Sequence, residues 1–399
     1  MTGPRPVSTP AGTSGRRTPP GEEASMRILV LVNSFHTGGF EQLMLEIMRE
    51  LGRDGFRFRI CCLKEEGTLG PEIRREGIPI DSGFIHGTYD LAGALRLSRR
   101  LRGERFDLLF VEPGRNALLA GEWAARSLRI RKRMSAIHAT RRWGRKRMFR
   151  TGEVRLLRRL DGVLLVAPTQ RDLLVREEGL DPKNLDVILN GVDHKKFRPR
   201  APEELPLLAE GPAPGEKAIG IVASLTPEKG HEVFLRAAAE ALAEVPEARF
   251  YIVGEGPERA AIEARIGSLG LAGRVRLTGR RRDLPEFLPR LRVLALSSHP
   301  FRETLPISTM EGMACGLATV NTDVGSVRDL VVPEETGLLV PPGDADAMAR
   351  AFVRLLRDEA LARRLGEASR RRIEERFTLE RTVEEYRRYF LRFAEGTTP

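Results

Sequence analysis

The sequence predicts an α/β protein with two Rossmann-like domains. The chain has 399 residues, a length typical of two domains of ordinary size. From residue 26 onward, short apolar runs alternate with amphipathic stretches of helical length, which favours parallel sheets covered by helices on both faces. A Pro-rich segment over residues 198–217 interrupts this alternation, and the same strand–loop–helix order restarts after it.

These observations divide the chain into four predicted segments. Residues 1–25 are rich in Pro, Gly, Ser and Thr, and we expect a disordered tail there. Residues 26–200 are predicted to form the N-terminal domain and residues 201–375 the C-terminal domain, with a final helix over residues 376–399. A run of about 20 apolar residues is absent, so the sequence predicts no transmembrane helix.

The N-terminal half opens with an apolar strand at residues 27–33, and Gly38 and Gly39 then begin an amphipathic helix. This order lets backbone N–H groups approach a phosphate, although a plain strand-to-helix turn is the more frequent explanation of a glycine pair. Thr169 is predicted to cap the last helix of this half. The remaining strands are expected at residues 57–63, 78–81, 106–112, 132–140, 163–167 and 185–189, and the remaining helices at residues 69–76, 89–102, 116–127 and 169–179.

The C-terminal half repeats the same order. Its strands are predicted at residues 218–225 and in the runs ARFYIV, VRLTG and RVLALSS, and residues 345–393 are predicted to be helical. Lys229 follows the first of these strands and precedes a helix that begins near Gly230. A cation at this place can meet a diphosphate leaving group, and an exposed loop lysine is the alternative.

Residues 299–331 carry the clearest functional signal. Glu303 and Glu311 stand eight positions apart, and a helix is expected over residues 306–315 because Pro306 fits a first helical turn. The N–H groups of that turn, around Leu305 and Ile307, would form an anion site. The stretch therefore predicts a phosphate cradle beside two hydroxyl-binding carboxylates, with a plain surface helix as the alternative.

These motifs resemble glycosyltransferase family 4, whose members have the GT-B fold, in which two Rossmann-like domains face each other across a cleft and a C-terminal helix crosses back to the N-terminal domain. The stretch around Glu303 and Glu311 is similar to the family's E-x7-E signature, which implies that Glu303 contacts the donor sugar and Glu311 the nucleotide ribose. The run GGFEQ resembles the family's glycine loop at the donor diphosphate, and LNGVDHKKFRP resembles its hinge. Thr304 stands where the family usually has glycine.

The resemblance assigns three further positions. Lys229 in SLTPEKG matches the donor-phosphate motif, and Ser224 stands where the family usually has a second phosphate-binding residue, arginine. His138 in SAIHAT matches a histidine that lies close to the reacting face of the sugar, where it would orient the donor. A satisfied structural histidine is the alternative at this position.

The charge distribution suggests anionic partners. The net charge is +11, and basic residues concentrate over residues 126–159, where Trp143, Met148 and Phe149 are interleaved. This pattern favours an anionic membrane surface, and a solvated basic face is the alternative. No zinc finger or aromatic-basic RNA motif is present, so we expect no nucleic-acid partner. The three cysteines and six histidines show no metal-ligand spacing, so we expect no metal.

The resemblance implies a retaining glycosyltransferase that moves a sugar from a nucleotide-diphosphate-sugar to a hydroxyl of a glycan or lipid-linked acceptor. We expect a cytoplasmic protein, peripheral at the inner face of the membrane, that acts in polysaccharide synthesis. The alternative is a nucleotide-sugar binding protein of the same fold with weak or no catalysis, which Ser224 and Thr304 favour. A sugar-nucleotide epimerase of GT-B fold is a second rival, but such enzymes lack this E-x7-E context.

Overall fold

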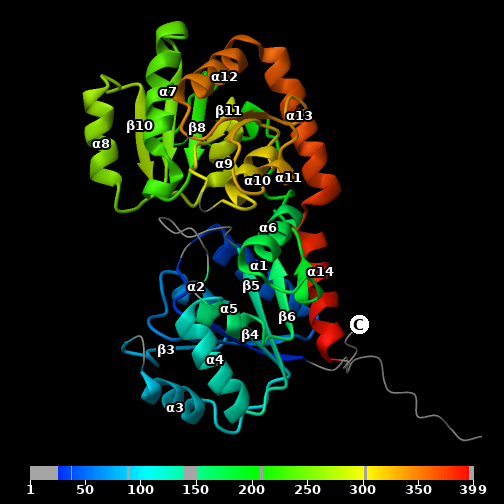
Figure 1. The fold of residues 1–399 in the computed structure, drawn as a ribbon. Coiled ribbons are helices and arrows are strands. Elements are labelled where there is room, and N and C mark those ends of the chain that lie inside the picture. Colours follow the sequence, from blue (N-terminus) through cyan, green and yellow to red (C-terminus); the bar gives the residue numbers. More distant parts are fainter. Residues whose placement is uncertain are drawn as a thin grey trace, which may run out of the picture.

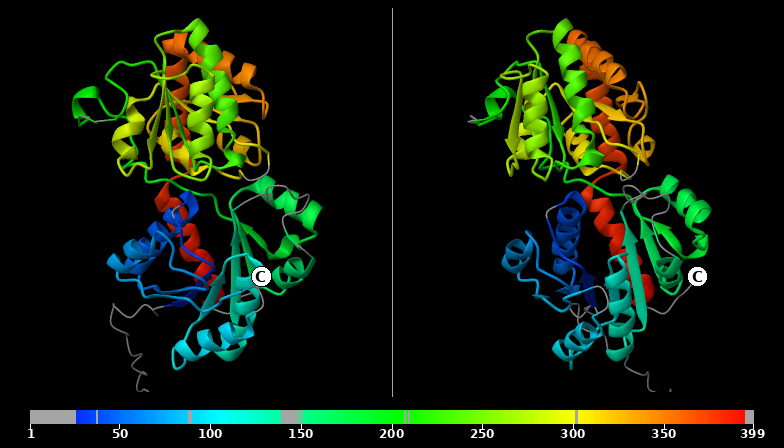
Figure 2. Two further views of the ribbon diagram at one scale, coloured as in Figure 1. Left: turned by 90° about the vertical axis from the view of Figure 1, so that its left-hand side faces the viewer. Right: turned by 60° about the vertical axis from the view of Figure 1, so that its left-hand side comes forward.

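The structure, a computed structural model, confirms the predicted α/β fold with two Rossmann-like domains (Figure 1). It describes residues 26–36, 38–87, 90–138, 149, 151–206, 208, 210–300 and 303–394. The predicted tail and the most basic part of residues 126–159 therefore lie outside the described residues. The two domains stack along the long axis of the molecule, and each contains a parallel sheet between helices (Figure 2).

The N-terminal sheet has the strand order β3-β2-β1-β4-β5-β6-β7, and all neighbouring strands run parallel. The winding reverses between β1 and β4, which marks the place where open parallel sheets bind ligands. Its strands are β1 (Arg27–Val32), β2 (Arg57–Cys62), β3 (Ile80–Ser82), β4 (Leu108–Val111), β5 (Lys132–Ile137), β6 (Gly162–Leu165) and β7 (Leu185–Val187). Its helices are α1 (Gly39–Arg53), α2 (Gly70–Arg75), α3 (Leu91–Arg100), α4 (Arg115–Ser127), α5 (Thr151–Leu157) and α6 (Pro168–Glu178).

The C-terminal sheet has the order β10-β9-β8-β11-β12-β13, again with parallel neighbours, and its winding reverses between β8 and β11. Its strands are β8 (Ala218–Val222), β9 (Arg249–Val253), β10 (Val275–Gly279), β11 (Val293–Leu296), β12 (Ala318–Thr322) and β13 (Leu338–Val340). Its helices are α7 (His231–Glu244), α8 (Arg259–Ser268), α9 (Leu284–Phe287), α10 (Ile307–Ala314), α11 (Val327–Leu330), α12 (Ala345–Arg357) and α13 (Glu359–Arg376).

Three local predictions need correction. Pro168 occupies the first turn of α6, where its missing N–H costs nothing, so Ala167 is the N-cap and Thr169 does not cap the helix. Pro306 is the extended N-cap of α10 and accepts a hydrogen bond from Met310 N at 3.2 Å, so the helix begins one residue later than predicted. Helix α5 was not predicted, because its residues were treated as part of the basic segment.

The last helix, α14 (Leu379–Ala394), crosses back to the N-terminal domain as predicted and runs beside α1 (Figure 1). The crossing occurs where Val192 and Thr378 form a parallel β-bridge. Tyr386, Phe390 and Phe393 of α14 then join the hydrophobic core on one face of the N-terminal sheet. Burial of these aromatic side chains attaches the end of the chain to the first domain.

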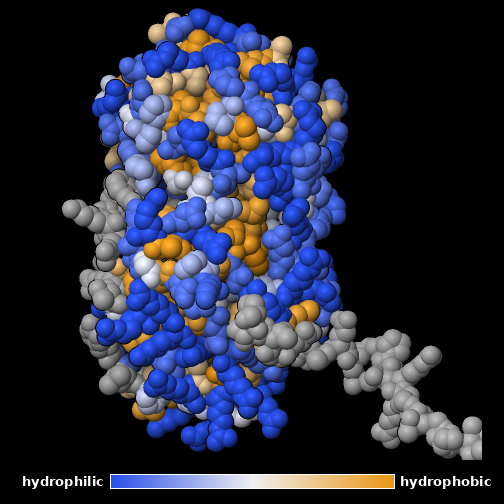
Figure 3. Space-filling view, turned by 45° about the vertical axis from the view of Figure 1, so that its right-hand side comes forward, coloured by the Kyte–Doolittle hydropathy of each residue, from blue (hydrophilic) through white to orange (hydrophobic). Residues whose placement is uncertain are grey.

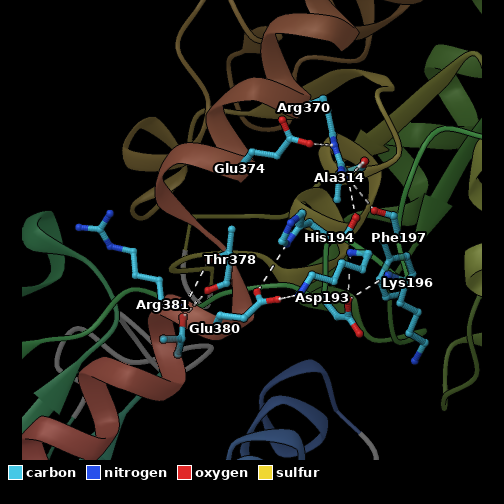
Figure 4. A network of polar contacts seen from close by, with 12 residues as sticks. Asp193, His194, Lys196, Phe197, Ala314, Arg370, Glu374, Thr378, Glu380 and Arg381 are labelled. Atoms are coloured by element: carbon cyan, nitrogen blue, oxygen red, sulfur yellow. Dashed lines mark hydrogen bonds and ion pairs between the residues drawn. The ribbon is translucent and has the colours of Figure 1, made fainter.

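Figure 4 shows the polar network at this crossing. Arg370 of α13 donates through Nη1 to the carbonyl oxygens of His194, Phe197 and Ala314, at 2.8, 2.9 and 2.7 Å. His194 and Phe197 belong to the segment that leaves the N-terminal domain, whereas Ala314 ends α10. Arg370 therefore fastens the hinge segment to the C-terminal domain.

Figure 3 brings the right-hand side of Figure 1 forward, and hydrophilic residues predominate there with small hydrophobic patches between them. Within the described ranges, no helix combines the length and the apolar character that crossing a bilayer requires.

Candidate active site

The two strands at the switch point of the C-terminal sheet, β8 and β11, carry the main site residues in the loops at their carboxyl ends. The loop after β8 contains the 3₁₀ turn Pro227–Lys229, and α7 follows at once. The loop after β11 contains Ser297, Ser298 and Glu303, and it leads into α10. Because β8 and β11 are neighbours, residues far apart in the sequence meet here.

Lys229 and Glu303 form an ion pair between Nζ and Oε1. The Glu303 side chain is only 7% exposed, and Ser298, itself buried, donates its hydroxyl to the same carboxylate oxygen at 2.9 Å. The sequence motifs predict Lys229 at a diphosphate and Glu303 at a sugar. In a nucleotide sugar these two groups are bonded to each other, so their binding residues must be adjacent, as they are here.

Two glycines allow the backbone to pack closely around the ion pair of Lys229 and Glu303. Gly230 has a φ of 63° and Gly325 a φ of 56°, a region that disfavours residues with a Cβ. A Cβ on Gly230 would collide with the carbonyl oxygen of Ser297, and one on Gly325 with that of Glu303. The Ser297 hydroxyl also donates to the Lys229 carbonyl at 2.8 Å. The loops after β8, β11 and β12 therefore interlock around the ion pair.

The N-terminus of α10 lies against the glycine loop of the other domain. A Cβ placed on Gly39 would stand 3.3 Å from Ile307 Cβ, so α1 and α10 approach closely at this point. Leu305 is buried, and its carbonyl oxygen accepts a hydrogen bond from Asn190 Nδ2 at 3.3 Å. The Gly38–Gly39 loop and the first turn of α10, both predicted to bind phosphate, thus lie next to each other at the contact between the domains.

Glu311 lies on the side of α10 that faces the N-terminal domain, where Glu46 of α1 and Lys196 of the hinge segment act on it. Burial, and then the negative charge of Glu46, raise the pKa of Glu311 to about 8. The pKa of Glu46 is also raised, mainly by burial. A carboxyl in this state can both donate to and accept from a ribose hydroxyl.

His138 follows β5, and its ring stacks on Phe40 of α1 with a centroid distance of 3.1 Å. Both ring nitrogens are buried and have no hydrogen-bond partner among the described residues. Burial lowers the pKa of His138 well below its usual value, so its imidazole is neutral. The stacking places His138 beside the glycine loop, which Phe40 directly follows.

Sequence reasoning missed His231, the first residue of α7. It is 4% exposed, and its ring nitrogens also have no partner within the described ranges. Burial, with a smaller effect of Lys229, lowers the pKa of His231 to about 4. The signal available was its place two residues after Lys229, at the carboxyl end of β8. Ser297 and Ser298 were also missed. The signal available for them was their place directly after β11.

Ser224 is exposed, and its hydroxyl lies 3.4 Å from that of Thr226. Arg281 pairs with Asp283 at 2.6 Å. No cluster of three or more His, Cys, Asp or Glu able to hold a metal ion occurs among the residues that the structure describes.

Two family models match the chain. The model described as Glycosyltransferase Family 4 matches residues 37–196, and the model described as Glycosyl transferases group 1 matches residues 209–372. The chain belongs to glycosyltransferase family 4. It is therefore a glycosyltransferase of the GT-B fold, and the family that its motifs resemble is confirmed.

Curated relatives of this glycosyltransferase include a UDP-Gal:alpha-D-GlcNAc-diphosphoundecaprenol alpha-1,3-galactosyltransferase of Escherichia coli. The two are 24% identical over 336 residues, which cover 81% of this chain and 86% of that protein. An N-acetyl-alpha-D-glucosaminyl L-malate synthase of Bacillus anthracis is 28% identical over 204 residues, covering 51% of this chain and 52% of that protein. The chain spans about half the length of several curated relatives that it matches.

Among solved structures, Anabaena HepE in complex with UDP-glucose superposes with a TM-score of 0.77 at 19% identity. The superposition covers 92% of this chain and 99% of that one. This likeness confirms the GT-B fold, with two domains facing each other and a returning C-terminal helix.

Proposed function

We propose that this protein is a retaining glycosyltransferase that transfers a sugar from a nucleotide-diphosphate-sugar to an acceptor hydroxyl. The observation that carries the proposal is the contact between Lys229 and Glu303 at the switch point of the C-terminal sheet. One residue is suited to a phosphate and the other to a sugar hydroxyl, and both lie where GT-B domains face each other.

In this mechanism the protein stabilises the charge that develops on the leaving diphosphate. Lys229, the N-terminus of α10 and the Gly38–Gly39 loop would surround that group with cationic and dipolar donors. Glu303 would hold the donor sugar, Glu311 the ribose, and neutral His138 would orient the sugar. The leaving phosphate would take the proton of the acceptor hydroxyl at the same face of the sugar, which gives retention. We expect no metal, because these groups supply the positive charge.

The donor we propose is a UDP-hexose. The Escherichia coli relative is named for UDP-Gal, and HepE is described with UDP-glucose. Thr304 would help to select the sugar, because it is 2% exposed beside Glu303 and its buried hydroxyl has no partner in the described part of the chain. A buried hydroxyl without a partner costs about 1–3 kcal/mol, which a sugar hydroxyl would recover.

The acceptor we propose is a glycan or lipid-linked molecule, reached from the cytoplasmic face of a membrane. Leu95 of α3 and Leu119 and Trp123 of α4 are 45%, 44% and 47% exposed, which is unusual for large apolar residues. They lie on neighbouring helices of the N-terminal domain, with Arg126 in the last turn of α4. Co-sedimentation with vesicles rich in anionic lipid tests this contact, and no binding at low salt would contradict it.

The alternative is a nucleotide-sugar binder with little or no catalysis, which the exposed Ser224 and the crowding Thr304 favour. A panel of UDP-, GDP- and ADP-sugars, with mass-spectrometric detection of hydrolysis or transfer, separates the two. The proposal predicts turnover of at least one donor by the wild type, loss of turnover in Glu303→Ala, and unchanged turnover in the exposed control Glu263→Ala. A thermal shift with a donor but no turnover would instead favour the binder.

A further inference from the structure

The two domains are joined beside the site by a contact between α6 and α11, in which Ser326 is the N-cap of α11 and Asp329 lies within that helix. The hydroxyl of Thr169, in the first turn of α6, hydrogen-bonds with Ser326 Oγ at 2.5 Å and donates to Asp329 Oδ2 at 2.7 Å. The backbone N–H of Thr169 also points to Asp329 Oδ2, at 3.4 Å. Helix α6, which contains Thr169, belongs to the N-terminal domain, and α11, which contains Asp329 and follows Ser326, belongs to the C-terminal domain (Figure 1).

The chemistry of this contact is that of a carboxylate at a helix N-terminus. Asp329 sits where the first-turn N–H groups of α6 leave a partial positive charge. The carboxylate that accepts from this helix comes from the other domain, so the contact depends on how the domains are placed. We call Thr169, Ser326 and Asp329 the interdomain latch.

The loop that carries the latch also supports the donor-sugar carboxylate. Ser326 N donates to the Thr304 carbonyl oxygen at 3.2 Å, and Gly325 packs directly against the Glu303 carbonyl. On the other side, Asn190 of the hinge segment donates to the Leu305 carbonyl at 3.3 Å. The backbone over residues 303–305 is therefore held from both sides by groups that depend on the placement of the N-terminal domain.

We propose that the interdomain latch makes the placement of Glu303 depend on closure of the two domains. This inference rests on the proposed function, since it assigns Thr169, Ser326 and Asp329 as positioning residues for the donor sugar. Contact of α6 with Asp329 and Ser326 holds the loop against residues 303–304 and brings the Glu303 carboxylate to the sugar. Two of the three groups proposed for the nucleotide diphosphate, Lys229 and the N-terminus of α10, lie in the C-terminal domain, so diphosphate binding depends less on this contact.

The loop has separate anchors to its own domain, so the latch can be opened without unfolding it. Arg372 of α13 donates to the carbonyl oxygens of Asp329 and Leu330, at 2.8 and 2.6 Å. Loss of the Thr169 hydroxyl therefore removes the two side-chain hydrogen bonds of the link to α6, keeps only the long backbone contact, and leaves α11 in place. The expected result is a lower kcat/KM for the nucleotide sugar, with the affinity for the nucleoside diphosphate preserved.

The test compares two variants of Thr169. Thr169→Val keeps the shape of the side chain and removes the hydroxyl, whereas Thr169→Ser keeps the hydroxyl. Asp358→Asn is the matched control, because Asp358 caps α13 within one domain by accepting from Leu361 N at 2.8 Å. Thr169→Val should lower kcat/KM for the nucleotide sugar by about tenfold, the low end of what one hydrogen bond to a charged group contributes. The dissociation constant for the nucleoside diphosphate should stay within about twofold, and Thr169→Ser should recover most of the loss.

Hydrogen exchange of residues 303–308 provides a readout that needs no turnover. These amides should exchange faster in Thr169→Val than in the wild type, Thr169→Ser or Asp358→Asn. The inference is overturned if Thr169→Val matches the wild type in exchange at these residues, or if Asp358→Asn loses as much kcat/KM. Failure of the proposed function is distinguishable, because the wild type itself would then turn over no donor.

Discussion

Replacing Glu311 by glutamine is expected to stabilise the protein at high pH and to change it little in acid. Burial and the charge of Glu46 raise the pKa of Glu311 from 4.5 to about 8, so the folded protein keeps a proton that the unfolded chain releases. This proton contributes stability fully below the unfolded pKa, and the contribution is lost as the pH rises through the folded pKa. The free energy of unfolding of the wild type should therefore fall between about pH 4.5 and about pH 8. The Glu311→Gln variant has no ionisable group at this position and should show no such fall.

The structure sets the size of this effect. Each pKa unit corresponds to about 1.4 kcal/mol, so a rise from 4.5 to about 8 corresponds to at most about 5 kcal/mol. Glu311 is only partly buried, and Glu46 and Lys196 can rearrange around its ionised form, which lowers the expected value. We expect the difference in unfolding free energy between Glu311→Gln and the wild type to grow by about 2 kcal/mol between about pH 5 and about pH 9.

Urea denaturation followed by circular dichroism at both pH values measures this difference. Glu263→Gln is the control, because Glu263 is exposed and pairs with Arg259 on the surface of α8. A difference between Glu311→Gln and the wild type that stays the same at both pH values would refute the assignment of Glu311 as a protonated carboxyl.

Three further predictions follow from the packing around the site and the crossing helix. Gly325→Ala should lower both thermal stability and transfer rate, because the new Cβ meets the Glu303 carbonyl, whereas Gly343→Ala, which also has a positive φ but open space around it, should lower stability alone. Ser298→Ala should lower kcat by about tenfold through loss of the hydrogen bond to Glu303, while Ser135→Ala, a buried serine whose hydroxyl has no partner in the described residues, should leave kinetics unchanged. Phe390→Ala should cost about 3–5 kcal/mol in denaturation experiments, because its fully buried ring joins α14 to the N-terminal core; a loss below about 1 kcal/mol would contradict that role.

Local patterns were sufficient to predict most of the fold. Apolar runs indicated the strands of the N-terminal sheet and most of those of the C-terminal sheet, although the short β13 was not predicted. The restart after residues 198–217 indicated two domains of the same order. Where prediction failed, two local signals competed: Thr169 is a good capping residue, but the preceding Pro168 already occupies the first turn of α6. The hydroxyl of Thr169 then reaches the other domain, which no local pattern could indicate.

The candidate site could be predicted only in part. Glu303 and Lys229 were found because each sits in a short motif, but their direct contact depends on β8 and β11 being neighbours, which strand order alone decides. Ser298 carries no motif, and buried serines are common, so only its place after β11 distinguishes it. The raised pKa of Glu311 arises partly from the charge of Glu46, which lies in the other domain. Spacing along the sequence could not predict that these two residues are close in space.

The most direct test of the site compares binding of a nucleoside diphosphate with binding of the matching nucleotide sugar by calorimetry. Lys229→Met should weaken both ligands by about tenfold or more, because it removes a phosphate contact. Glu303→Ala should leave the diphosphate unchanged and abolish the additional affinity that the sugar provides. Equal weakening of both ligands by Glu303→Ala, or unchanged binding in Lys229→Met, would contradict the division of roles on which the account depends.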